Sequence, residues 1–395
     1  MKTFSLLIAL TLLTGGIALS PPTAYAQDDK QGDFERIWHD TCYTKKDVEK
    51  CYLLSKELVD KFPTSTFIEY AKGRIKIYEK DKVVGKFQAA LGAYSSAPDA
   101  AKLDQLFAAG EECLKSDKIE AAVHQYVIGR MALAGAGGAT GEIYKNLDKV
   151  KGYAETALKT FEPAAAPVGW KKEDWDPQRE FVLAQINQYL GWHYILGTKS
   201  DMNLGLDFLA KAIQVKGKEG VGWRDPNNYY LRSTAHSNLY AELKKPYDAM
   251  TDEQKISDEG KELRKKLNDY LDNKLIPEYA RLLATANRPE SKSLYDVIRP
   301  NFDAYWEYRT GAKEKAADYI KNYVADPTIN AVPIPAKPED TSNLNAPMAP
   351  TTTPANVKLS TGGAPAAPGK AANGNGGKPK PTKKASPKGR KRGRG

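Results

Sequence analysis

Apolar residues recur at helical spacing through most of residues 33–325. In one segment, Val182, Ile186 and Leu190 fall on a single face. Intervals of four residues belong to an amphipathic α-helix, and sustained alternation of period two is nearly absent. The pattern predicts an all-α fold with about a dozen helices of roughly 12–20 residues, joined mainly by short turns. Within it, Pro277 predicts a break or kink in an otherwise long helix.

One motif, Val-Gly-Trp followed by Asp-Pro, occurs twice. The first copy spans residues 168–177 and the second spans residues 221–226. Aspartate is a favourable N-cap, and proline suits the first helical turn because that position needs no N–H donor. We therefore expect a duplicated unit in which an extended loop leads into a helix, beginning at Pro177 and at Pro226.

Small residues recur where the two helices of a hairpin would touch. Residues 106–126 read Leu-x2-Ala-Gly-x2-Cys, a turn, and then Ala-x3-Tyr. Residues 190–212 contain Leu-Gly-x2-Tyr and Gly-x3-Leu-x2-Ala, and partial matches begin at Cys51 and Val150. These spacings resemble the tetratricopeptide repeat, a hairpin of about 34 residues with W-x2-L-G-x2-Y in its first helix and A-x3-F in its second.

The resemblance implies a right-handed solenoid of helical hairpins over residues 27–335. In such a stack each hairpin completes the core of its neighbour. Members of this family bind extended peptides or other proteins in the concave groove. A protein or peptide partner in that groove is what the resemblance implies for this chain.

The N-terminus has the organisation of a secretory signal peptide. Lys2 precedes an apolar run from Phe4 to Leu13, and Ala24-Tyr25-Ala26 forms a small-x-small cleavage signal. We expect residues 1–26 to be removed and the mature chain to be periplasmic or extracellular. The apolar run is short for a membrane span, and no later segment is apolar enough to be one.

Residues 336–395 differ in composition from the rest of the chain. They are rich in Pro, Ala, Gly and Lys, contain no aromatic residue, and are expected to be disordered because they bury too little apolar area to offset the ordering entropy. Their net charge is +10, which equals that of the whole chain, so residues 27–335 are close to neutral. Nine cations form the last basic run: Lys378, Lys380, Lys383, Lys384, Lys388, Arg390, Lys391, Arg392 and Arg394.

A basic run of this kind attracts polyanions in a salt-sensitive way. For an exported protein, the candidates are anionic lipid headgroups, cell-wall or surface polysaccharide, and nucleic acid. The alternative is a solubilising spacer without a specific ligand.

The sequence contains no recognisable catalytic or metal-binding motif. Its four histidines are scattered without metal-ligand spacing, and there is no nucleophile elbow. The glycine-rich stretch 135–141 lacks the lysine of a phosphate-binding loop, so we expect a flexible loop between helices. The prediction is a non-enzymatic protein without cofactor or metal. A helical enzyme acting on polysaccharide remains a third hypothesis, which requires two converging carboxylates.

The cysteines leave two interpretations open. Cys42 and Cys51 would lie at the facing ends of two antiparallel helices, and export permits a disulfide between them. The alternative is that each is a small buried residue at a packing position. Cys113 would be a buried free thiol in either case.

Aromatic residues in the two Val-Gly-Trp segments form a candidate ligand-contact rim. Trp170, Trp175 and Trp223 have cations nearby, including Arg224, and exposed tryptophan and arginine favour binding hot spots. The alternative is that these rings close the ends of helix pairs, because large aromatic side chains contribute most when buried.

Two functional hypotheses follow. The first is an exported adaptor whose helical repeats hold a protein or peptide while the tail attaches to an anionic surface. The second is a polyanion-binding protein in which the tail is the active element. Deleting residues 336–395 distinguishes them, because only the second loses its function.

Overall fold

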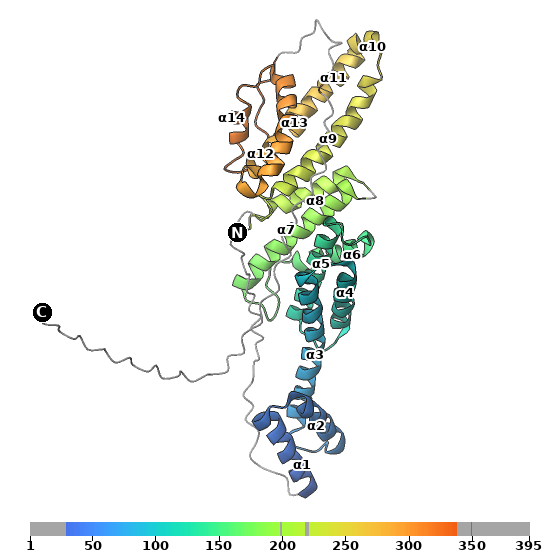
Figure 1. Ribbon diagram of the computed structural model, residues 1–395, viewed down its shortest axis with the longest axis vertical. Helices are drawn as coiled ribbons and strands as arrows, with labels where there is room; N and C mark the ends of the chain where they lie inside the picture. Colours follow the sequence, from blue (N-terminus) through green and yellow to red (C-terminus); the bar gives the residue numbers. More distant parts are fainter. Residues whose placement is uncertain (1–28, 198–199, 218–220, 338–348, 350–395) are drawn as a thin grey trace, which may run out of the picture.

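The computed structural model describes residues 29–197, 200–217, 221–337 and 349. These residues form an all-helical protein, as the apolar spacing predicts, and the described part contains no β-strand. Figure 1 shows an elongated arrangement, with α1 at one end and α10 at the other. The predicted signal peptide lies outside the described residues, as does the predicted tail apart from Ala336, Lys337 and Ala349.

The first helices pack around a small core, which we call the N-terminal lobe. Trp38 is fully buried there and donates a hydrogen bond from Nε1 to Ser55 Oγ over 2.8 Å. Phe67 packs tilted against Trp38, with 5.7 Å between ring centroids. The elements of this lobe are α1 (Asp29–His39), the π-helical η1 (Asp40–Lys45), α2 (Val48–Lys61) and the start of α3 (Ile68–Ser96).

Helix α3 connects the N-terminal lobe to the rest of the protein (Figure 1). Its 29 residues exceed the expected length, because its two ends serve different cores. Ala71 is buried in the lobe, whereas Phe87 and Leu91 are buried in the next cluster. None of the residues 72–83 between them is buried.

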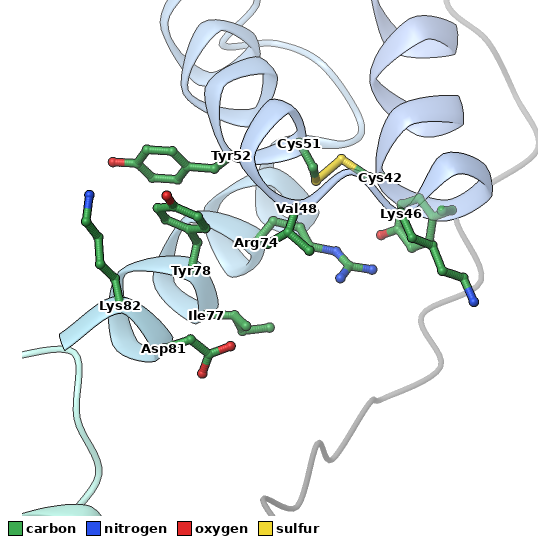
Figure 2. Close-up of a pocket in the computed structure, with 11 residues that line it drawn as sticks. Cys42, Lys46, Val48, Cys51, Tyr52, Arg74, Ile77, Tyr78, Asp81 and Lys82 are labelled. Atoms are coloured by element: carbon green, nitrogen blue, oxygen red, sulfur yellow. A yellow bond between two sulfur atoms is a disulfide. The ribbon is translucent and has the colours of Figure 1, made fainter. Parts of the chain in front are cut away.

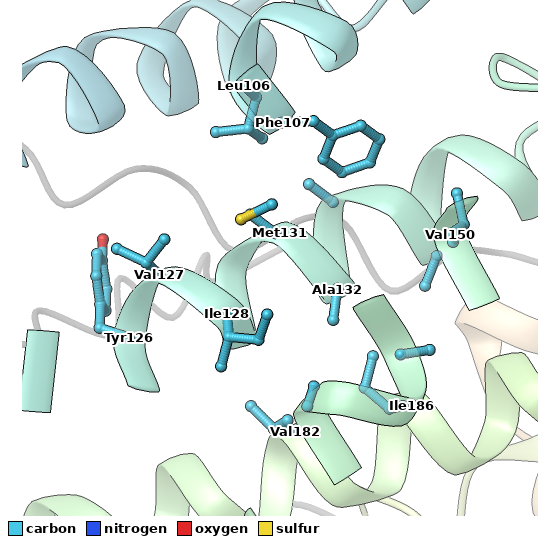
Figure 3. Packing of buried hydrophobic residues seen from close by; sticks show 14 of the residues in the cluster. Leu106, Phe107, Tyr126, Val127, Ile128, Met131, Ala132, Val150, Val182 and Ile186 are labelled. Carbon is cyan, nitrogen blue, oxygen red and sulfur yellow. The ribbon is translucent and has the colours of Figure 1, made fainter. Parts of the chain in front are cut away.

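A large central core surrounds α5, which is buried on nearly all sides. Figure 3 shows Met131 directed toward Leu106 of α4, while Ile128 lies on the side of Val182 of α7. A helix that is apolar all round is stable only when other helices enclose it. The helices of this region are α4 (Ala100–Lys115), α5 (Ala121–Thr140), α6 (Leu147–Phe161) and α7 (Lys172–Leu196).

The predicted loop at residues 135–141 is wrong, because residues 135–140 form the last turns of α5. A β-carbon at Gly135 would lie 3.1 Å from Val150 Cγ1, and one at Gly138 would lie 2.7 Å from Leu103 Cδ2. The glycines therefore allow α4 and α6 to approach α5 closely. Such packing outweighs the helix penalty of glycine, which is about 1 kcal/mol per residue.

A second large core follows in the C-terminal half. From α2 to α9 each helix packs against the next in sequence, and α7 also contacts α5 and α9. The remaining helical elements are α8 (Met202–Gln214), α9 (Pro226–Asp248), α10 (Asp252–Ile256), α11 (Asp258–Tyr270), η3 (Leu271–Leu275), α12 (Ile276–Ala286), η4 (Pro289–Ser291), α13 (Lys292–Thr310) and α14 (Ala316–Lys321).

The two copies of the Val-Gly-Trp motif are alike in the loop and different in the helix. Gly169 and Gly222 both have left-handed backbone angles, with φ of 93° and 85°. The predicted helix start at Pro226 is confirmed, because Asp225 caps α9 by accepting a hydrogen bond from Asn227 N.

The predicted helix start at Pro177 is wrong, because α7 already begins at Lys172. Asp176 does not cap the helix and instead pairs with Lys172 over 2.5 Å. Trp175 is fully buried and stacks on Phe161, with 5.1 Å between ring centroids. This contact stabilises the extra helical turn before Pro177.

The interruption predicted at Pro277 is present as a π-helical turn. Segment η3 (Leu271–Leu275) directly precedes α12, and Pro277 lies in the first turn of that helix. Proline offers no N–H to the carbonyl four residues earlier, and its ring needs space there. A local π-helical turn relieves both constraints.

Candidate functional site

A pocket of about 460 Å³ opens on the N-terminal lobe between η1, α2 and α3 (Figure 2). We call it the α2–α3 pocket. Its walls combine apolar, aromatic and cationic side chains on a disulfide-bonded floor. Its lining includes Val48 and Tyr52 of α2, and Arg74, Ile77, Tyr78 and Lys82 of α3.

The floor of the pocket is the predicted cysteine pair. Cys42 of η1 and Cys51 of α2 are joined by a disulfide, with 4.9 Å between their α-carbons. Asp47 caps α2 by accepting a hydrogen bond from Lys50 N over 3.0 Å. The bridge and the cap together fix the start of α2 relative to η1.

One wall is a pair of stacked tyrosines. The rings of Tyr52 and Tyr78 lie 4.1 Å apart at an angle of 19°. Tyr52 donates its hydroxyl proton to Glu79 over 3.3 Å, and Tyr78 donates to Glu49. The hydrogen bond to Glu49, with smaller effects of burial and of the nearby charges of Glu49 and Tyr52, raises the pKa of Tyr78. Tyr78 is therefore neutral at physiological pH.

Two apolar side chains lie exposed at this pocket. Val48 is 66% exposed and Ile77 is 49% exposed. Within the described residues no other element covers them. Covering apolar surface contributes roughly 25 cal/mol per Å² removed from water, so these side chains favour a partner that buries them.

Cations surround the apolar side chains. Arg74 lies 4.6 Å from the centroid of the Tyr43 ring, and Lys82 lies 5.8 Å from that of Tyr78. Lys46 also lines the pocket, and Asp81 is the lining carboxylate. None of the three cations forms an ion pair with a carboxylate in the described part of the chain. The pocket is therefore suited to a ligand with both apolar and acidic groups.

The predicted rim residues do not form one surface. Trp175 is fully buried, so its predicted contact with a ligand is wrong. Trp170 is half-buried and packs against Trp175, with 5.8 Å between ring centroids. Both rings close the central core, which is the structural alternative considered for them.

Trp223 and Arg224 lie together elsewhere and are engaged within the chain. The Arg224 guanidinium lies 4.2 Å from the centroid of the Trp223 ring and donates a hydrogen bond to Ala325 O over 2.6 Å. Lys216 lies on the same ring and pairs with Asp326 over 3.2 Å. These contacts hold the start of the segment 325–337, which we call the C-terminal strap.

The third cysteine does not line this pocket. Cys113 is a buried free thiol, and burial followed by the charge of Glu112 raises its pKa. The nine tail cations between residues 378 and 394 lie outside the described residues.

Sequence reasoning missed Tyr52, Ile77 and Tyr78 because the pocket forms only where α2 packs on α3, and apolar spacing does not show which positions of two packed helices meet. One local signal was present. Ile75 and Ile77 are two positions apart in a helix, so they face roughly opposite sides, and only one of them can lie on the packed face.

The described residues contain no cluster of three or more His, Cys, Asp or Glu side chains that could hold a metal ion. Among the helices described, none has the length and apolar character needed to cross a membrane. Comparisons of the chain with protein-family models, with curated proteins and with solved structures found no match.

Proposed function

We propose that this protein is an exported, non-enzymatic binding scaffold that holds an acidic, partly apolar peptide segment of a partner protein in the α2–α3 pocket. The observation that carries the proposal is the exposure of Val48 and Ile77 beside stacked tyrosines and cations that have no ion-pair partner among the described residues. A bound segment would bury the two apolar side chains and supply carboxylates to the cations. Buried anchors with a polar rim are the usual arrangement of a binding hot spot.

The scaffold itself is proposed to be a right-handed solenoid of the tetratricopeptide type. Support comes from the packing of successive helices and from close helix contacts at the repeat positions. A β-carbon at Gly110 would lie 2.3 Å from Met131 Sδ, and one at Gly191 would lie 2.5 Å from Leu209 Cγ. The resemblance implied that a partner binds in the concave groove. We propose that the partner contacts the α2–α3 pocket, because exposed apolar side chains and cations line it.

Export is proposed from the N-terminal sequence and is supported by the disulfide. Disulfides persist in oxidising compartments such as the periplasm and the extracellular space. The basic tail is proposed to attach the scaffold to an anionic surface through its nine terminal cations. The competing function is polyanion binding by the tail alone, and it would use the same nine terminal cations.

A peptide-display selection against residues 27–395 tests the proposal. We expect enriched peptides to combine carboxylates with aliphatic or aromatic side chains. Their affinity should fall at least tenfold for Ile77→Asp and for the double variant Arg74→Glu/Lys82→Glu. The matched control is Val297→Asp, because Val297 is an exposed helical valine, 44% accessible, on distant α13.

Two outcomes would contradict the proposal. If the peptides bind wild type and Ile77→Asp with equal affinity, the peptide-binding site is not the α2–α3 pocket. A protein that loses all binding when residues 336–395 are deleted, with affinity that falls steeply as salt rises, would favour the polyanion function.

A further inference from the structure

A second pocket, of about 470 Å³, lies in the C-terminal half between α8, α9, η3, α12 and the C-terminal strap. We call it the α9–α12 pocket. Leu206, Ala210 and Ile213 of α8 form an apolar wall, and Ile329 of the strap adds to it. Charged residues of α9, η3 and α12 complete the lining, and small-molecule sites commonly combine apolar surface with a few polar groups.

The charged wall is a buried triad of two arginines and one glutamate. Arg232 donates from Nε and Nη2 to the two carboxylate oxygens of Glu278, over 2.9 and 2.8 Å. Arg281 donates from Nη1 to Glu278 Oε1 over 2.5 Å and from Nη2 to Ile329 O over 2.7 Å. The strap is therefore fixed by the same arginine that completes the triad.

The triad has one positive charge more than it has negative charge. Side-chain exposure is 16% for Arg232, 12% for Arg281 and 2% for Glu278, so little water screens this excess. In the described residues, no acceptor contacts Arg232 Nη1. An uncompensated buried charge is costly, and an anion placed beside it is correspondingly favoured.

The other residues at the pocket leave this excess in place. Lys274 is an exposed residue of the pocket lining, and no carboxylate of the described chain pairs with it. Asp207 is also exposed and is the second carboxylate of the lining, after Glu278. His236 also lines the pocket, and its burial lowers its pKa to about 4. Glu278 opposes this shift, and the neighbouring cations add to it. His236 is thus neutral at physiological pH, and the pocket carries three cations against two carboxylates.

We propose that the α9–α12 pocket binds a small oxyanion, a carboxylate or phosphate group carried by a molecule with a short apolar body. The oxyanion accepts from Arg232 Nη1 and approaches Lys274, while the body contacts Leu206, Ala210 and Ile213. The site is separate from the α2–α3 pocket and does not depend on peptide binding there.

Calorimetric titration of residues 27–395 tests the site. The probes are inorganic phosphate, succinate and butyrate, with chloride at matched ionic strength as the control. We expect saturable binding of at least one probe, and the comparison of phosphate with the two carboxylates identifies the preferred group.

Two exposed residues provide a charge-matched pair of variants that leave the buried triad intact. Lys274→Gln should weaken binding about three- to tenfold, and Asp207→Asn should tighten it about three- to tenfold, as expected for one unit charge removed at a few ångströms. Ala210→Trp should abolish binding by filling the pocket. Circular dichroism checks that each variant keeps its helical content.

The proposal is overturned if none of the probes binds saturably below about 10 mM, a Kd that corresponds to only weak association. It is also overturned if Lys274→Gln and Asp207→Asn change the Kd in the same direction, because a general effect on folding would then explain both. Unchanged peptide binding in these variants shows that the two sites are independent.

Discussion

Gly191 of α7 lies so close to Leu209 of α8 that a β-carbon at residue 191 would be 2.6 Å from Leu209 Cδ2. Gly205 of α8 is in the reciprocal position, where a β-carbon would lie 2.6 Å from Ile195 Cγ1. The two helices therefore approach each other through paired glycines. This contact lies in the α7–α8 hairpin, one of the two hairpins that carry the clearest matches to the repeat.

The first prediction concerns that contact. Gly191→Ala should destabilise the protein by about 1–3 kcal/mol, because an added methyl group must displace well-packed atoms. Urea denaturation, monitored by circular dichroism, measures the change in the free energy of unfolding. The matched control is Gly152→Ala in α6, where nothing lies within 4 Å of the added β-carbon. There we expect stabilisation of about 0.5–1 kcal/mol from helix propensity, and equal effects at both sites would refute the interpretation.

The helical fold could be predicted because patterns over a few neighbouring residues determine it. Apolar spacing identifies helices, and small residues at the repeat positions identify where helices touch, as at Gly191. The same reasoning failed at Gly135 and Gly138, which lie in the interior of α5. Composition cannot distinguish a glycine that ends a helix from one that admits a neighbouring side chain, because the neighbour is remote in sequence.

The candidate pockets could be predicted only in part, for the same reason. The Cys42–Cys51 pair is separated by nine residues and was found from spacing. Arg232 and Glu278 are 46 residues apart and meet only through the packing of α9 against α12. One signal was available, since Glu278 lies in the otherwise largely apolar run from Leu275 to Leu283, where a buried acid needs a charged partner.

The second prediction concerns the disulfide. Replacing Cys42 and Cys51 with serine should lower the stability of the N-terminal lobe by about 2–3 kcal/mol, because the bond closes a short loop in the unfolded chain. Hydrogen exchange should quicken in α1 and α2 and remain unchanged in α12. Titration of thiols in the denatured, unreduced protein should find one, from Cys113. Three free thiols would show that the bond is absent.

The third prediction concerns the C-terminal strap. Arg224→Met removes the guanidinium that lies over the Trp223 ring and donates the hydrogen bond to Ala325 O. We expect amide exchange in residues 325–332 to quicken about fivefold, which corresponds to a loss of about 1 kcal/mol.

Arg179→Met is the control for the strap, because Arg179 donates to Glu162 O and Pro163 O in a different loop. It should quicken exchange after α6 and leave the strap unchanged. Loss of peptide binding in Arg224→Met with unaltered strap exchange would instead restore the ligand-rim interpretation of Arg224.

The fourth prediction is the pH dependence of stability. Burial, opposed by Glu278 but assisted by Arg232, Lys274 and Arg281, lowers the pKa of His236 from 6.5 to about 4. The unfolded state therefore binds more protons than the folded state between these values, and stability falls as pH decreases from 6.5 to 4. Burial raises the pKa of Glu278, but the arginines outweigh it and lower the value from 4.5 to about 2. Its contribution is present above pH 4.5 and is lost between 4.5 and 2.

Urea midpoints measured from pH 8 to pH 3 separate the two groups. In wild type we expect stability to fall in both windows, with His236 accounting for up to about 3 kcal/mol. In His236→Gln, which can still bond the hydroxyl of Tyr270, the fall between pH 6.5 and 4.5 should nearly vanish, while the fall below pH 4.5 remains because Glu278 is unchanged. An identical pH profile in the variant would mean that folding does not lower the pKa of His236, and that the α9–α12 pocket gains a further positive charge as pH falls below 6.5.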